Sequence, residues 1–165
     1  MGQEINSSSN SSIQAIHIGQ GWTKPPPNQF KLNFDASWID ALNSAGYGLI
    51  VRVDTGTATQ ARAGTFQASS AEEAEAMSLL EATKWAQSMN LKDFWMEDDC
   101  QRLIHYAQGK ASNIFWRNKT LIEEAMKILH SCHHFLGLTY MNRRCNVVAD
   151  TLAKEARKRH IHKQQ

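Results

Sequence analysis

The stretch from Phe30 to Trp38 constrains the fold of this chain more than any other. Apolar side chains at Phe30, Leu32 and Phe34 alternate with polar ones, which is the period-2 pattern of a β-strand with one face against a core. Asp35 follows on the polar face, where the strand is expected to end. The pattern therefore predicts a half-buried strand that holds a carboxylate at its end, a position well suited to chemistry.

The rest of the domain supplies further strands and helices in a definite order. Alternation and β-forming residues predict strands at 46–53, 57–66, 93–97 and 135–141, while helical periodicity predicts helices at 69–89, 98–106, 116–130 and 147–158. Three strands, a helix, a strand, two helices, a strand and a helix make an α/β domain. This order predicts a mixed sheet with helices on its faces.

Three further acids stand at the starts or ends of these predicted elements. They are Glu75 on the helix at 69–89, Asp99 after the strand at 93–97, and Asp150 in the first turn of the last helix. A single acid is most often solvated or caps a helix, so the argument depends on the set. We propose that folding gathers these three carboxylates and Asp35 into one metal-binding cluster.

Capping motifs account for several neighbouring polar residues. Ser69 with Glu72, or Ser70 with Glu73, has the spacing of a capping box at the start of the helix at 69–89. Glu72 shares the inward helical face almost as well as Glu75, but capping gives Glu72 and Glu73 a structural role, which leaves Glu75 as the predicted site residue. Asp98 and Asp99 are similarly predicted to cap the next helix.

Length and low-complexity segments predict one domain with tails. A chain of 165 residues with 42% apolar side chains is long enough for one core. The polar run 6–12 predicts a disordered N-terminal tail over 1–21. The domain is predicted at 22–159 and begins at Trp22, shortly before a run of three prolines. A basic C-terminal tail is predicted at 160–165.

The cysteines and the hydropathy exclude several classes of protein. Cys100, Cys132 and Cys145 are odd in number and lack CxxC spacing, which indicates reduced thiols and an intracellular location, in the nucleus or cytoplasm. A zinc site is poorly supported, because no second ligand pair accompanies Cys132 and the two histidines after it. No apolar run is long enough to cross a membrane, so we expect no membrane association.

From Trp22 to about Arg159 the chain resembles the type 1 ribonuclease H family, most closely the branch common in plants and related to reverse-transcriptase elements. The matching motifs are 22–27, 31–37, 46–48, 74–76, 97–99, Trp116 and 146–153. The resemblance implies a ribonuclease H-like fold with a five-stranded mixed sheet in the order 3-2-1-4-5, whose first three strands are antiparallel. It implies catalytic and metal-binding roles for Asp35, Glu75, Asp99 and Asp150.

The resemblance also implies a two-metal-ion mechanism in which the enzyme cleaves the RNA strand of RNA/DNA hybrids. Two Mg²⁺ ions, or Mn²⁺ in their place, would be held by the four acids, with Asp35 between them. The expected partner is nucleic acid, with no obligate protein partner. The expected contacts are Ser37, Gln101, Arg143 and Lys154, although the basic residues near the end also fit a solvated helix end or a weak nuclear-import signal.

Tyr140 departs from the family pattern, since many members carry a histidine ten residues before the last acid. Tyrosine ordinarily keeps its proton at neutral pH and cannot share the role of a histidine, so slow turnover is expected. Two alternatives to the nuclease remain open. One is a nucleic-acid-binding module that does not cleave usefully, and the other is a fold retained for protein contact alone.

Overall fold

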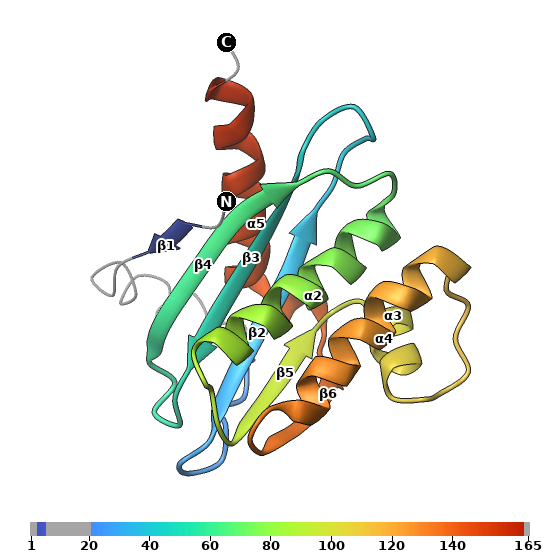
Figure 1. The fold of residues 1–165 in the computed structure, drawn as a ribbon. Helices are drawn as coiled ribbons and strands as arrows, with labels where there is room; N and C mark the ends of the chain where they lie inside the picture. Colours follow the sequence, from blue (N-terminus) through green and yellow to red (C-terminus); the bar gives the residue numbers. More distant parts are fainter. Residues whose placement is uncertain (1–2, 6–20, 164–165) are drawn as a thin grey trace.

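The computed structural model describes residues 3–5 and 21–163, with the backbone alone for 3–5 and 161–163. Its centre is a six-stranded sheet in the order β1-β4-β3-β2-β5-β6 (Figure 1). The strands are β1 (Gln3–Ile5), β2 (Phe30–Ser37), β3 (Ala45–Arg52), β4 (Ala58–Phe66), β5 (Phe94–Asp98) and β6 (Phe135–Tyr140). The strand predicted from alternation, β2, therefore lies inside the sheet.

Strand directions follow the predicted topology. β2, β3 and β4 form an antiparallel meander, and β5 then lies parallel to β2, with β6 parallel to β5 on its other side. Counted from β2, the five strands stand in the predicted order 3-2-1-4-5, which is confirmed. The parallel pairing brings the carboxyl end of β5 beside β2.

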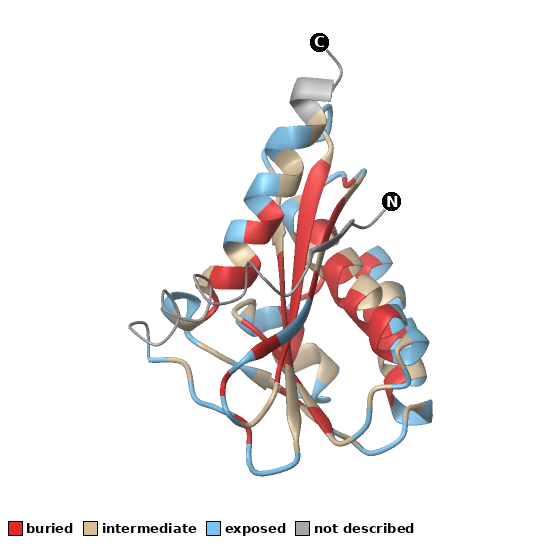
Figure 2. Cartoon of the chain, turned by 90° about the vertical axis from the view of Figure 1, so that its left-hand side faces the viewer, coloured by how far each residue is buried: buried red, intermediate tan, exposed pale blue. Residues whose placement is uncertain are grey.

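Helices cover both faces of this sheet, as predicted. α2 (Ala71–Ser88), α3 (Gln101–Ala107) and α4 (Trp116–Ser131) lie on one face, and α5 (Val147–Lys163) lies on the other, after a short 3-10 turn at Arg143–Cys145 (Figure 1). None of the helices in the described part of the chain is both long and apolar enough to cross a membrane. Buried residues concentrate along the strands and on the helix sides that face them (Figure 2).

The alternation of β2 divides its side chains between two cores. Leu32 and Phe34 are fully buried against the residues of α2 and α4. On the other face, Ile50 of β3 packs with Val148 and Leu152 of α5. Asn33 and Asp35 are two residues apart in β2, so both side chains point to the face of the sheet that α5 covers. On that face β2 therefore presents polar side chains at these two positions.

Two terminal expectations need correction. Gln3–Ile5 lie within the predicted disordered tail, yet they form β1, which pairs antiparallel with Ala61–Ala63 of β4; the rest of that tail, apart from Gly21, lies outside the described residues. At the other end α5 continues through Lys163, beyond the predicted boundary at 159.

Trp22, in the segment before β2, packs against the sheet and contacts residues of β3 and β5. Its Nε1 donates to Glu97 Oε2 at 3.1 Å, and the guanidinium of the buried Arg52 lies 4.5 Å from its ring centroid. Glu97 also pairs with Lys31 Nζ at 2.7 Å. Glu97 also accepts a hydrogen bond from Asn33 and directly precedes Asp98, so these contacts hold the end of β5 that carries Asp98 against β2.

Helix α5 lies directly on the backbone of β3 because β3 carries glycine at two contact positions. A Cβ on Gly48 would lie 2.2 Å from the carbonyl oxygen of Ala149, and one on Gly46 would lie 2.0 Å from that of Ala153. Any side chain at these positions would push the helix away. Gly48 pairs with Asp35 in the sheet, so this contact also sets how close the first turn of α5 comes to Asp35.

Candidate metal centre

Asp35 lies near the end of the central strand and is almost completely buried, with 4% of its surface exposed. Its Oδ1 accepts a hydrogen bond from the backbone N–H of Ala36 at 2.9 Å. That contact uses one lone pair and leaves most of the acceptor capacity of the carboxylate available. The strand thus supplies a buried acid at the predicted position.

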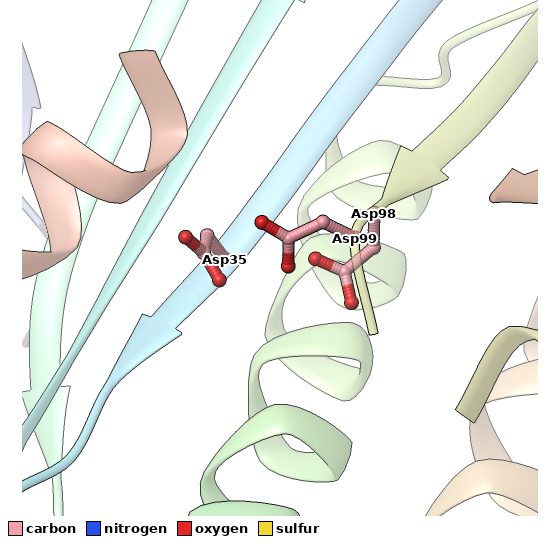
Figure 3. A group of neighbouring side chains, drawn as sticks. All are labelled: Asp35, Asp98 and Asp99. Carbon is pink, nitrogen blue, oxygen red and sulfur yellow. The ribbon is translucent and has the colours of Figure 1, made fainter. Parts of the chain in front are cut away.

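The carboxyl end of β5 contributes two adjacent acids, Asp98 and Asp99. One carboxylate oxygen from each lies within 4.8 Å of the other and of an oxygen of Asp35 (Figure 3). Asp98 is fully buried and Asp99 is half-buried. The structure therefore brings Asp35 and Asp99 together as expected, and adds Asp98 to them.

Asp98 is the site residue that the sequence reasoning missed. It was assigned to a helix cap, but it is the last residue of β5, and the N-cap of α3 is Cys100, which makes no side-chain capping bond. The signal was present in the alternation, because Phe94 and Met96 are buried and Asp98 continues the same face. The strand simply runs one residue further than predicted.

Glu75 reaches the cluster from α2. Burial raises its pKa well above the usual value, and the charges of Asp98 and Asp35 raise that pKa further. Its Oε2 is buried and has no hydrogen-bond partner among the described residues. Glu75 is thus electrostatically part of the site, although it lies outside the tight group of three oxygens.

Capping explains why Glu75, rather than a neighbour, faces the site. Ser70 is the N-cap and accepts the N–H of Glu73 at 3.0 Å, so the second of the two proposed capping pairs holds the helix start. Glu72 does not cap this helix. Its Oε1 instead accepts hydrogen bonds from the N–H of Phe115 and the amide of Asn118, each at 2.8 Å, and so fastens the start of α4 to α2.

Asp150 borders the site from the first turn of α5. Its charge raises the pKa of Asp35 and of Asp99, while its own Oδ2 is 2.9 Å from Lys154 Nζ. The acid therefore faces the cluster and is partly neutralised by a lysine one turn along the same helix. Of the four predicted metal ligands, Asp150 is the only one that forms an ion pair with a lysine within residues 21–160.

The cluster is strongly unfavourable as a set of charges. Burial, together with the charges of neighbouring carboxylates, raises the pKa of Asp35 to about 9 and that of Asp98 to about 8. Backbone N–H groups and a hydrogen bond with Glu75 offset only part of the effect on Asp98. Arg143 opposes the repulsion at Asp99, where its positive charge lowers a pKa that burial raises.

These residues fit a hard divalent cation. The donor set is entirely carboxylate oxygen, which is the ligand type that Mg²⁺ and Mn²⁺ prefer. Two acceptors, Glu75 Oε2 and Asp99 Oδ2, are buried with no hydrogen-bond partner in the described part of the chain, a costly arrangement unless something else satisfies them. A cation would satisfy those oxygens and offset the repulsion together.

The four residues predicted to contact nucleic acid lie around this cluster. Ser37 ends β2 and accepts a hydrogen bond from Arg157 Nε at 2.9 Å, and Gln101 begins α3 with an exposed side chain. Arg143 is exposed and acts electrostatically on Asp99, while Lys154 is exposed and pairs with Asp150. Each lies next to one of the predicted metal ligands, and the contacts with nucleic acid stay predictions.

Tyr140 stands beside the site at the end of β6. It pairs with Asp98 across the sheet and is 45% exposed. His134 is ion-paired with Asp93 at 2.8 Å, at the opposite end of β5, and its neighbour His133 lies there too. Neither histidine can therefore reach the carboxylates in place of a histidine at position 140.

Comparison with known proteins agrees with this architecture. The family model described as reverse transcriptase-like matches residues 33–156. No curated protein matches the sequence. Among solved structures, ribonuclease H1 of Halobacterium salinarum is 20% identical, with a TM-score of 0.71 over 78% of this chain and 97% of that one.

Two further structures extend the likeness. The N-terminal RNase H domain of a Mycobacterium tuberculosis protein is 17% identical, with a TM-score of 0.72 over 83% of this chain and 99% of that one. A ribonuclease H1 isolated from compost, solved in complex with an RNA/DNA hybrid, is 18% identical, with a TM-score of 0.72 over 81% of this chain and 99% of that one. At these identities the likeness shows the fold, which is that of ribonuclease H. With three quarters of its length matched by the family model, the chain belongs to the reverse transcriptase-like family of ribonuclease H-fold domains.

Proposed function

We propose that this protein is a metal-dependent endoribonuclease that cleaves the RNA strand of RNA/DNA hybrids. The observation that carries the proposal is the convergence of Asp35 and Asp99, with Glu75 and Asp150 around them, at one end of a ribonuclease H-fold sheet. The complex of the compost enzyme with a hybrid supports the choice of substrate. We also propose an intracellular location, since the three cysteines, all in the described part of the chain, form no disulfide.

The side chains divide into those that hold metal and those that orient nucleic acid. Asp35, Glu75, Asp99 and Asp150 would hold two divalent cations, Mg²⁺ or Mn²⁺. When bound, such ions supply Lewis acidity and lower the pKa of water, which favours attack at a phosphate. The protein positions these acids on four different elements, so the site exists only in the folded chain.

The substrate strands would lie across the exposed residues beside the cluster. Gln101 offers an amide that can donate to and accept from ribose and base edges, and Arg143 supplies a positive charge at the mouth of the site. Lys154 is already held by Asp150, so it would contact a phosphate only from the outer side. Hybrid shape and the 2′-hydroxyl, rather than base sequence, would then select the substrate.

Turnover is expected to be slow because Tyr140 occupies the position beside Asp98. A tyrosine lacks the imidazole nitrogens with which a histidine exchanges protons near neutral pH. The second candidate function, a binding module that does not cleave usefully, rests on this one substitution. The two candidates predict the same binding and differ only in cleavage.

A hybrid cleavage assay separates them. The protein is incubated with a hybrid labelled on its RNA strand, in Mg²⁺, in Mn²⁺ and in EDTA, beside Asp35→Asn and Asp99→Asn. We expect metal-dependent shortening of the RNA that both variants lose, with single-stranded and double-stranded RNA left intact. Binding of the hybrid without metal-dependent cleavage, unchanged in the two variants, would support the module instead.

A further inference from the structure

Asp98 is a carboxylate that the four-acid arrangement does not use. It is fully buried at the end of β5, where its Oδ2 accepts the N–H of Cys100 at 3.2 Å and its Oδ1 lies 3.4 Å from Nδ2 of Asn146. No lysine or arginine within residues 21–160 forms a salt bridge with it. Its nearest charged neighbours, including Glu75, are acids.

A structural role does not require this charge. The contacts of Asp98 with Cys100 and Asn146 need only an acceptor, which an asparagine or a threonine would provide without bringing a further acid among Asp35, Glu75 and Asp99. Burying an ionised carboxylate without a counter-charge costs several kcal/mol by general estimate. A divalent cation held by Asp35, Asp98 and Asp99 would supply that counter-charge.

The geometry of the oxygens suits such a cation. Ligand oxygens of an octahedral ion at about 2.0–2.1 Å lie about 2.9 Å apart when adjacent and about 4 Å apart when opposite. The oxygens of Asp35, Asp98 and Asp99 are all within 4.8 Å of one another, so movements of roughly an ångström each would bring them onto one ion. The three come from two adjacent strand ends, which hold them at this spacing (Figure 3).

A second observation concerns Asn146, which is 1% exposed and contacts Asp98. Its Nδ2 donates to the carbonyl oxygen of Phe34 at 2.9 Å and approaches Asp98, but its Oδ1 is buried with no partner among the described residues. Asp99 Oδ2 is likewise buried and has no hydrogen-bond partner among the described residues. Two unsatisfied acceptors therefore flank Asp98, and oxygen acceptors in such a place fit a bound cation or its water.

We propose that Asp98 is a fifth metal-binding carboxylate of this site, which binds a divalent cation together with Asp35 and Asp99. The inference rests on the proposed function and deepens it. Four ionised carboxylates neutralise the four positive charges of two divalent ions. A fifth carboxylate leaves the site with one net negative charge. Asp98 therefore strengthens binding of the first cation, at the expense of the stability of the metal-free protein.

The test measures metal binding and stability without requiring cleavage. Asp98→Asn keeps the shape of the side chain and removes its charge. Asp93→Asn is the matched control, because Asp93 is an exposed acid immediately before β5, at the other end of the strand from Asp98. Mn²⁺ affinity is measured by electron paramagnetic resonance and by calorimetry, and melting temperature is measured in EDTA and in Mn²⁺.

For Asp98→Asn we expect Mn²⁺ affinity to fall by at least about tenfold, the lower range for losing a group that tunes a metal site. The melting temperature in EDTA should rise and the increase caused by Mn²⁺ should shrink. Asp93→Asn alters only the contact with His134, so Mn²⁺ affinity and the increase in melting temperature caused by Mn²⁺ should match those of the parent. If Asp98→Asn fails to fold, Asp98→Thr retains an acceptor for Cys100 and carries the same expectation.

Two results would overturn the proposal: an Mn²⁺ affinity of the variant within about twofold of the parent, or no Mn²⁺ binding by the parent at all. Its failure can be told from that of the proposed function. Reduced Mn²⁺ binding by Asp98→Asn, in a parent protein that does not cleave hybrids, supports Asp98 and refutes the nuclease. Metal-dependent cleavage with unchanged Mn²⁺ affinity in the variant does the reverse.

Discussion

Without divalent cations, the free energy of unfolding should fall as pH rises from about 5 to 9. Burial and mutual repulsion raise the pKa of Asp35 to about 9 and that of Asp98 to about 8, against 3.8 for an ordinary aspartate. Between those values the folded protein holds protons that the unfolded chain has released. Stability is unaffected below the unfolded pKa and is lost as pH rises toward and through the folded pKa values.

The magnitude follows from the number of protons held. Each proton retained only by the folded state changes the free energy of unfolding by about 1.4 kcal/mol per pH unit. Because the two acids are close neighbours, we count one proton between them, which gives a loss of about 2.7 kcal/mol from about pH 6 to about pH 8. That is a large share of the roughly 5–15 kcal/mol by which domains are stable.

Urea denaturation in EDTA across this pH range measures the effect. The double variant Asp35→Asn, Asp98→Asn is the control, since it keeps every histidine and removes two of the acids whose pKa is raised. Glu75 remains, and burial raises its pKa as well, so the profile of the variant should be shallower than that of the parent but not flat. Saturating Mg²⁺ should also reduce the slope in the parent, because the cation replaces the protons. A free energy of unfolding that stays constant or rises with pH in the metal-free parent would refute the electrostatic description of the site.

Three further outcomes test the surroundings of the site. Gly48→Ala should destabilise the fold by about 1–3 kcal/mol, measured by urea denaturation, because its methyl group would meet the backbone of α5; an unchanged stability would contradict that contact. Trp22→Ala should cost about 2–4 kcal/mol by losing the hydrogen bond to Glu97 and the stacking on Arg52, and Trp22→Phe should recover the stacking part alone. Tyr140→His should raise multiple-turnover cleavage by about tenfold or more if proton exchange limits the rate, and equal rates would show that another step does.

The fold was predictable because its signals are local. Alternation from Phe30 to Phe34 identified the central strand, and the placement of Asp35 at its end followed from parity alone. What the sequence could not show was where regular structure stops. Asp98 belongs to β5 only because it pairs with Tyr140 of β6, a contact between distant parts of the chain.

The same limit applies to roles that depend on a partner element. Glu72 looked like a capping residue, since capping motifs lie close together in sequence. Its actual role, accepting hydrogen bonds at the start of α4, depends on residues more than forty positions away. For Asp98, the alternation of Phe94 and Met96 indicated which face of the strand position 98 would take, but not that the strand extends to it.

The two glycines under α5 have a consequence for how this domain can vary. Because the backbone of β3 touches the backbone of α5 there, the backbone distance between Asp35 and Asp150 is set by that contact, and only the side-chain rotamers of the two acids remain adjustable. Outward-facing positions of the helix are open to almost any replacement, since none of them takes part in that contact. A redesign for a larger ion would need a greater distance between β3 and α5. Even a single methyl group at Gly46 or Gly48 would collide with the backbone of α5.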